Sequence, residues 1–172
     1  MDSPTATPTA TPNPIPAPPD PKPLVYVAGP LTTGNMALNT NRAIKVWASM
    51  VRSGLITPFC PHFTTLGDLI LGESLGYEDY MRYDFEIIRH CDAVYRLSGA
   101  SSGADREVTL AASLDIPVFF ESTVEGVSSG LMEWAYGFCV ANGMKVSERL
   151  RYAATGTMPS VRRQSARVEM AQ

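Results

Sequence analysis

The sequence predicts an α/β fold in three layers, with a parallel sheet of four or five strands between two layers of helices. Two observations lead to this prediction. Short apolar segments alternate along the chain with longer segments whose apolar residues recur at helical spacing, which is typical of strand–helix–strand units. Apolar residues make up 45% of the 172 residues, which is enough for the core of one domain. A parallel sheet of this kind is covered by helices on both faces.

The elements follow from local signals along the chain. The first expected strand is Leu24–Gly29, and a turn-rich loop from Pro30 follows it. Asn39 or Thr40 can cap the next helix, which we expect to end at Gly54. The other expected elements, in order, are a strand over Leu55–Phe59, an irregular segment over Pro61–Tyr77 with one helical turn at Leu66–Leu71, a helix over Tyr77–His90, a strand over Asp92–Leu97, a helix over Ala104–Leu114, a strand over Ile116–Phe120 and a helix over Val124–Asn142.

Composition divides the chain into three parts. Residues 1–23 hold nine of the 14 prolines among Thr and Ala, so we expect a disordered arm with polyproline II character. Residues 1–144, which include the expected folded domain over residues 24–144, hold 8 Lys/Arg and 15 Asp/Glu. Residues 145–172 hold 6 Lys/Arg and 2 Asp/Glu and are expected to form a basic, flexible tail. The folded part is acidic and lacks a basic stripe, so a solvated basic end is favoured over nucleic-acid binding.

Other patterns in the chain indicate a cytoplasmic protein without a bound metal. The N-terminal stretch lacks the basic start and apolar run of a signal peptide, and no apolar run is long enough to span a bilayer. Cys60, Cys91 and Cys139 are odd in number and set among apolar residues, as expected of reduced thiols in a core. Cys60 and His62 offer two metal ligands but have no second pair elsewhere, so we expect no metal site and no cofactor.

Three loops of unusual composition follow predicted strands, at Gly29-Pro30, at Phe59–His62 and at Ser98–Gly103. The carboxyl ends of parallel strands meet at one edge of a sheet, and ligands bind beyond that edge. In the third loop a turn rich in Gly and Ser runs into a helix start, where N–H groups, hydroxyls and the helix dipole favour negative charge. The sequence therefore predicts a ligand site at this edge, with an anionic group beside the turn.

Two carboxylates lie on the apolar stripes of predicted helices. Asp84 lies four residues from both Tyr80 and Ile88, and Glu107 lies on the stripe that includes Ala111. A carboxylate that faces a core is destabilising unless it is paired or hydrogen-bonded. Both residues are therefore candidates for a functional role beside the turn.

Local partners would also explain these two positions. Asp84 can meet Arg96 or a tyrosine hydroxyl, and Glu107 can favour the helix start, with Ser102 and Asp105 forming a capping box. Paired carboxylates beside such a turn also suit glycosyl transfer, which needs a nucleophile and an acid/base group. The helix start would keep Glu107 ionised as the nucleophile, and a more buried Asp84 would hold a proton and donate it.

One set of motifs extends over Leu24 to Phe120. It consists of Val25-Tyr26-Val27-Ala28-Gly29-Pro30, Tyr83-Asp84 ahead of Cys91-Asp92-Ala93-Val94, Gly99-x-Ser101-x-Gly103-Ala104-x-x-Glu107, Ala111 and Ile116-Pro117-Val118. These motifs resemble the nucleoside 2-deoxyribosyltransferase-like family, in particular its small phage and bacterial members and the related deoxynucleoside monophosphate N-glycosidases. The resemblance implies a flavodoxin-like, Rossmann-like fold and a homo-oligomer in which a neighbouring subunit completes the site.

The resemblance also implies a reaction, the cleavage or transfer of the N-glycosidic bond of a 2′-deoxynucleoside or its 5′-monophosphate. Glu107 would be the nucleophile that attacks the sugar C1′, and Asp84 would handle protons at the base. Tyr26 falls near the family's first-strand tyrosine. Ser101 matches the position that contacts the 5′-phosphate in the monophosphate hydrolases, and Gly103 leaves room for the sugar.

Four further residues are expected to contact the substrate. Gly29 and Pro30 follow the first strand, and His62 follows the second, where a capped loop histidine is an equally good interpretation. Asn142 is a candidate for the family's C-terminal substrate contact. The alternative function for the whole chain is a non-catalytic module that binds or senses a nucleotide.

Overall fold

The computed structural model of the protein describes residues 21–72, 75–122 and 126–156. The predicted arm up to residue 20 and the tail beyond residue 156 lie outside these described residues. None of the helices within the described ranges is long and apolar enough to cross a membrane.

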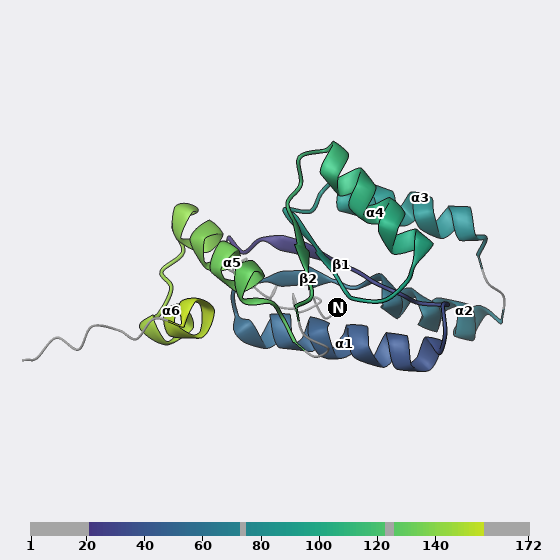
Figure 1. Cartoon of the computed structure of the whole chain (residues 1–172), viewed down its shortest axis with the longest axis horizontal. Coiled ribbons are helices and arrows are strands. Elements are labelled where there is room, and N and C mark those ends of the chain that lie inside the picture. The colour runs from purple at the N-terminus through teal and green to yellow at the C-terminus, as the bar shows by residue number, and fades with distance from the viewer. Residues whose placement is uncertain (1–20, 73–74, 123–125, 157–172) are drawn as a thin grey trace, which may run out of the picture.

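A parallel sheet of four strands forms the middle layer of the protein (Figure 1). Its strand order is β2-β1-β3-β4, and each neighbouring pair is parallel. The sequence prediction of a parallel α/β sandwich is therefore confirmed. The strands are β1 (Leu24–Ala28), β2 (Thr57–Phe59), β3 (Ala93–Arg96) and β4 (Val118–Phe120).

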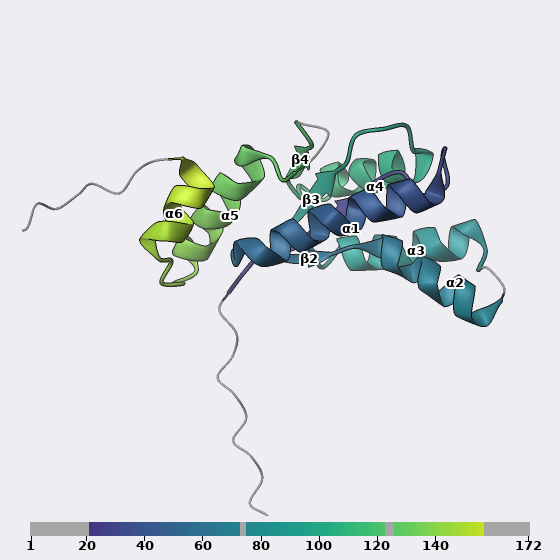
Figure 2. The same ribbon diagram turned by 90° about the horizontal axis from the view of Figure 1, so that it is seen from below.

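Helices cover both faces of the sheet. Helices α1 and α5 pack on one face, and α3 and α4 pack on the other, so that the sheet lies between two helical layers (Figures 1 and 2). The short 3₁₀ helix and α2 follow β2 directly and extend beyond the carboxyl edge of the sheet. The helices are α1 (Met36–Ser53), the 3₁₀ helix η1 (Pro61–Thr64), α2 (Thr65–Leu71), α3 (Tyr77–Ile88), α4 (Ser102–Ser113), α5 (Ser129–Ala141) and α6 (Glu148–Thr155).

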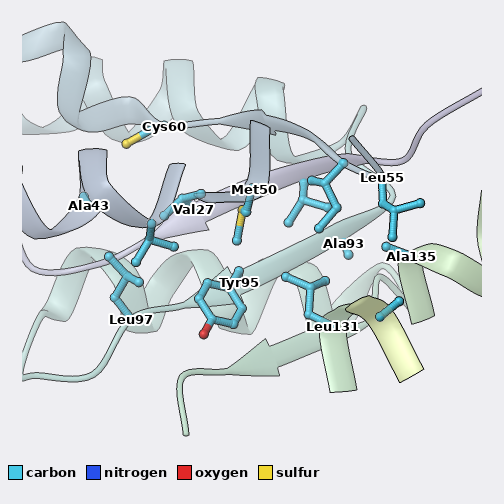
Figure 3. Packing of buried hydrophobic residues seen from close by; sticks show 14 of the residues in the cluster. Val27, Ala43, Met50, Leu55, Cys60, Ala93, Tyr95, Leu97, Leu131 and Ala135 are labelled. Carbon is cyan, nitrogen blue, oxygen red and sulfur yellow. The ribbon is translucent and has the colours of Figure 1, made fainter. Parts of the chain in front are cut away.

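Alternate residues of β1 enter two separate cores, because successive side chains of a strand point to opposite faces. Val25 and Val27 are fully buried in the core beneath α1 and α5, with Met50 and Leu131 among their neighbours (Figure 3). Tyr26 is fully buried on the opposite face, in the core beneath α3 and α4. Tyr26 therefore reaches the side of the sheet that carries Asp84 and Glu107.

Helix α1 begins earlier than the sequence predicts. Asn35 is the N-cap, and its side-chain oxygen accepts a 3.0 Å hydrogen bond from the Leu38 N–H. The predicted cap Asn39 lies inside the helix, where its amide donates to the carbonyls of Leu31 and Thr33. These bonds hold the loop after β1 against the first turn of α1, which explains why a polar residue occupies this position of the helix.

The folded domain extends past residue 144. The sequence analysis expects a flexible tail from residue 145, but Ser147 caps α6, and Gly156 ends it in the left-handed conformation. Ala154 is buried, and Leu150 packs against the core beneath α1 and α5. Helix α6 has only eight residues, most of them polar or small, and so few apolar positions did not reveal this contact from sequence.

The packing of α6 can be tested with Ala154→Asp, with Tyr152→Asp as the control at an exposed position of the same helix. A charge at the buried position has no partner, so we expect Ala154→Asp to lower the free energy of unfolding by about 2–4 kcal/mol. The control should change it by less than about 1 kcal/mol. Urea unfolding followed by circular dichroism measures both, and equal losses would show that α6 does not pack on the core.

Candidate active site

A cavity of about 700 Å³ lies beyond the carboxyl edge of the sheet. It opens between the loops after β1 and β3, where the chain departs to α1 on one face and to α4 on the other. Ligands of open parallel sheets bind at such a divergence. The site residues that line the cavity are Gly29 and Leu31 after β1, His62 after β2, Asp68 of α2, Tyr77, Tyr80, Met81 and Asp84 of α3, and Ser101, Gly103 and Glu107 at the start of α4.

Three polar side chains meet where this cavity adjoins the sheet. The Tyr26 hydroxyl of β1 donates a 2.8 Å hydrogen bond to Oε1 of Glu107. The carboxyl group of Asp84 also interacts with the Tyr26 hydroxyl, whose single proton is donated to Glu107. Asp84 and Glu107 are only 7% and 6% exposed, although both line the cavity. Of the partners considered for Asp84, the structure selects a tyrosine hydroxyl and not Arg96, which binds Asp105 instead.

Burial sets the protonation of this group. Loss of hydration and the nearby Asp84 carboxylate raise the pKa of Glu107 to about 7, against the Tyr26 hydrogen bond and the Arg96 charge, which lower it. Burial likewise raises the pKa of Asp84 to about 6. The pKa of Tyr26 is raised by burial and by both carboxylates, so its hydroxyl stays a donor. The two carboxyl groups together hold one proton between about pH 6 and about pH 7.

This result reverses one expectation from the sequence. The helix start was expected to keep Glu107 ionised and a deeper Asp84 protonated, but Glu107 is the more buried and has the higher pKa. Glu107 lies in the second turn of α4, beyond the N–H groups at the helix start, and the dipole effect falls off within the first turn. Desolvation therefore outweighs the helix dipole at this residue.

Asp84 has an unsatisfied oxygen. Its Oδ1 is buried and has no hydrogen-bond partner within the described protein. A buried polar atom without a partner is destabilising, and such atoms are concentrated at functional sites. A ligand in the cavity that donates a hydrogen bond to this oxygen would remove the free-energy cost of leaving it without a partner.

The start of α4 forms one wall of the cavity. Ser101 is the N-cap, and its Oγ accepts a 3.2 Å hydrogen bond from the Ala104 N–H, so the cap is not the predicted pair of Ser102 and Asp105. A Cβ at Gly103 would lie 3.6 Å from both the Met81 Sδ and the Tyr77 hydroxyl. A Cβ there would make ordinary van der Waals contacts and would occupy part of the cavity beside these two side chains.

The loops after β1 and β2 are held together at the cavity. His62 is buried, and its Nε2 lies 3.0 Å from the Pro30 carbonyl, which can only accept; Nε2 therefore carries the proton. Burial lowers the pKa of His62, which keeps the ring neutral. Gly29 is needed for packing, since a Cβ there would approach Leu97 Cδ1 to 2.9 Å. Gly29 and His62 line the cavity, whereas Pro30 supports it from behind.

The structure does not bring Asn142 to the cavity. Asn142 follows α5, where its side-chain amide donates to the Phe138 carbonyl. It is absent from the cavity lining of this chain, so it does not join Asp84 and Glu107 within one protomer.

One pair of cavity residues was missed from the sequence. The Tyr80 hydroxyl of α3 donates to Asp68 of α2, and both residues line the cavity. The only available signal was an acidic residue within the apolar segment from Leu66 to Leu71, in a region predicted to be irregular.

Among the described residues, no group of three or more His, Cys, Asp or Glu side chains is arranged to hold a metal ion.

Fold and cavity together define a parallel α/β protein with a site of two buried carboxyl groups and a tyrosine. The chain belongs to a family described as a domain of unknown function, DUF4406, whose model matches residues 23–120. The matched region runs from β1 to β4 and contains Tyr26, Asp84 and Glu107. A comparison with curated proteins finds no match.

The protonation of the site can be tested through stability with Glu107→Gln. The folded state binds the Glu107 proton more tightly than the unfolded chain does, so the associated stability is complete below about pH 4.5 and is lost as the pH rises to about 7. Glutamine resembles the protonated form at every pH. We therefore expect Glu107→Gln to raise the free energy of unfolding at pH 8 by roughly 2–3 kcal/mol and to change it little at pH 4.5.

Urea unfolding at the two pH values measures this difference. Glu86→Gln removes an exposed carboxylate from α3 and is the matched control, for which we expect no change beyond about 0.5 kcal/mol. A loss of stability for Glu107→Gln at pH 8 would contradict the assignment.

Proposed function

We propose that this protein cleaves or transfers the N-glycosidic bond of a 2′-deoxynucleoside or its 5′-monophosphate through a covalent intermediate on Glu107. The observation that carries the proposal is the pair of buried carboxyl groups that share the Tyr26 hydroxyl beside a cavity of about 700 Å³. Retaining glycosyl transfer requires two carboxyl groups in different protonation states. The motif resemblance over residues 24–120 supports the same chemistry.

Each of the three side chains has a role in the proposed reaction. The Glu107 carboxylate attacks C1′ as the bond from C1′ to the base nitrogen breaks, and the electron pair of that bond moves to the base. Asp84 donates a proton to the leaving base. A second base or a water molecule then attacks C1′, Asp84 takes up the proton of that nucleophile, and Glu107 is released. Tyr26 orients Glu107 through its 2.8 Å hydrogen bond.

The free site holds one proton between about pH 6 and about pH 7, and it lies on Glu107, which has the higher pKa of the two carboxyl groups. The proposed reaction therefore requires this proton to pass from Glu107 to Asp84 when the substrate binds. The Tyr26 hydrogen bond favours the ionised form of Glu107, and a substrate that donates to Asp84 Oδ1 fills the position that lacks a partner. The three free cysteines are buried, which suits the cytoplasm that we propose as its location.

The reaction can be tested with a panel of deoxynucleosides and their monophosphates. We expect wild type to release free base, with a rate that is highest between about pH 6 and about pH 7, and Asp84→Asn to lower kcat by about 10²- to 10⁴-fold because the acid is lost. Chromatography of the base measures release. Incubation with a 2-fluoro-2-deoxynucleoside should add the sugar mass to the Glu107 peptide, and Glu107→Gln should show neither adduct nor turnover.

Glu86→Gln, which removes an exposed carboxylate from the same helix as Asp84, is the matched control and should keep wild-type rates. If wild type releases no base from any member of the panel and forms no adduct, the proposal fails. Stabilisation by one of these ligands without turnover would instead favour a nucleotide-binding module.

We further propose that the protein acts as a homo-oligomer in which a second copy covers α2 and completes the cavity. None of the α2 residues is buried, and the side chains of Leu69 and Ile70 are 79% and 74% exposed beside the cavity. A patch of large exposed apolar residues is typical of a protein–protein contact. The exposed apolar residues of this region are Phe63, Leu66, Leu69, Ile70, Leu71 and Leu75.

The oligomer can be tested with Ile70→Asp. This side chain makes no core contact, so we expect the fold to persist, the molar mass to fall to that of one chain and base release to fall at least tenfold. Light scattering after size exclusion measures the mass. Val140→Asp, at an exposed apolar position of α5, should keep the wild-type mass. A monomeric wild type would refute the proposal.

A further inference from the structure

We propose that Arg42 and Glu121 are positioning residues, which fix Ser98 and thereby hold the Ser101–Gly103 wall of the cavity in place for the substrate. The inference rests on the function proposed above, because it concerns how that site receives its sugar. Neither residue lines the main cavity. Both therefore act through the loop that joins β3 to α4.

The two side chains bind both backbone groups of Ser98. Oε2 of Glu121 accepts a 2.8 Å hydrogen bond from the Ser98 N–H, and Nη1 of Arg42 donates a 2.9 Å bond to the Ser98 carbonyl. Nη2 of Arg42 also donates to Ser98 Oγ and to Glu121 Oε2. Arg42 comes from α1, and Glu121 directly follows β4. One residue of the loop is thus attached to elements on both sides of it.

Arg96 holds the neighbouring residues of the same loop. Its guanidinium donates to the Leu97 carbonyl, to the Gly99 carbonyl at 2.9 Å and to Asp105 of α4 at 2.9 Å. The carbonyls of Leu97, Ser98 and Gly99 are therefore each bound by an arginine. Two residues further along, Ser101 caps α4 and begins the cavity wall. The path of the loop into that wall is fixed by charged side chains rather than by apolar packing.

Fold stability alone is a poor explanation for the Arg42–Glu121 pair. The Glu121 side chain has no exposed surface, and its Oε1 has no partner among the described residues; the same holds for Nε of Arg42. Removing two charges from water offsets much of their attraction, and apolar residues of similar size often stabilise a fold as well. The pair provides what apolar residues lack, which is directional bonds to the backbone of Ser98.

The position of the wall matters because the sugar must lie between it and the two carboxyl groups. Ser101, Gly103, Asp84 and Glu107 line the same cavity, and the first two stand at the end of the loop that Ser98 begins. A displacement of about 1 Å by a distant substitution can lower a rate about 10²-fold when reacting atoms must be aligned. Loss of the Arg42–Glu121 pair should therefore lower the rate of the reaction without changing the pKa values of the carboxyl groups in the site.

The test replaces the charged pair by an apolar pair, Arg42→Met with Glu121→Leu. We expect kcat/KM for base release to fall about 10- to 100-fold while the pH profile keeps its midpoints and the unfolding temperature stays within a few degrees of wild type. Amide hydrogen exchange should become faster at residues 98–103 and remain unchanged in the four strands of the sheet. Arg89→Met with Glu86→Leu, an equal change at an exposed ion pair of α3, should leave every readout at its wild-type value.

A second variant keeps the test decisive if the apolar pair folds poorly. Glu121→Gln retains the acceptor for the Ser98 N–H and loses only the charge, so we expect a smaller fall in kcat/KM of about 3- to 10-fold. A double variant with kcat/KM within twofold of wild type overturns the proposal. If wild type itself is inactive on every substrate, the proposed function fails and the exchange data decide, with unchanged exchange at residues 98–103 refuting the positioning role.

Discussion

The Tyr26 hydroxyl is the group on which the arrangement of the site depends. It lies on a fully buried residue of the sheet, it donates a hydrogen bond to Glu107 of α4, and it interacts with the carboxyl group of Asp84 of α3. Two buried carboxyl groups without such a partner would be strongly destabilising. The register of both helices on this face is therefore tied to one strand residue, whose ring also stacks on Phe59 of β2 with centroids 5.8 Å apart.

Much of the fold and the central part of the site follow from local patterns. Buried strands and the apolar stripes of helices produce recognisable patterns within short stretches of sequence, so the order of the elements was predictable. Asp84 and Glu107 were found because a carboxylate on such a stripe conflicts with the pattern around it. The structure brings both to one cavity, and Tyr26, which does not line the cavity, binds Glu107 from β1.

The features that escaped sequence analysis depend on distances between segments far apart in the chain. The relative pKa values of Asp84 and Glu107 were expected in the wrong order, because burial in three dimensions outweighs the local helix dipole. The contact of Asp68 with Tyr80 requires the relative placement of α2 and α3. Helix α6 is a short segment of eight residues whose burial depends on its contact with the core beneath α1 and α5. Each of these features depends on packing between segments far apart in the chain, which the periodicity of apolar residues within one segment does not describe.

The core beneath α1 and α5 extends beyond the region that the family model matches. The shared region ends at residue 120, yet Leu131, Ala135 and Cys139 of α5 are fully buried against the sheet. A chain cut after residue 120 would leave this face of its sheet partly open to water. The fold of this protein therefore depends on a helix outside the matched region, while the face that carries the two carboxyl groups lies within that region.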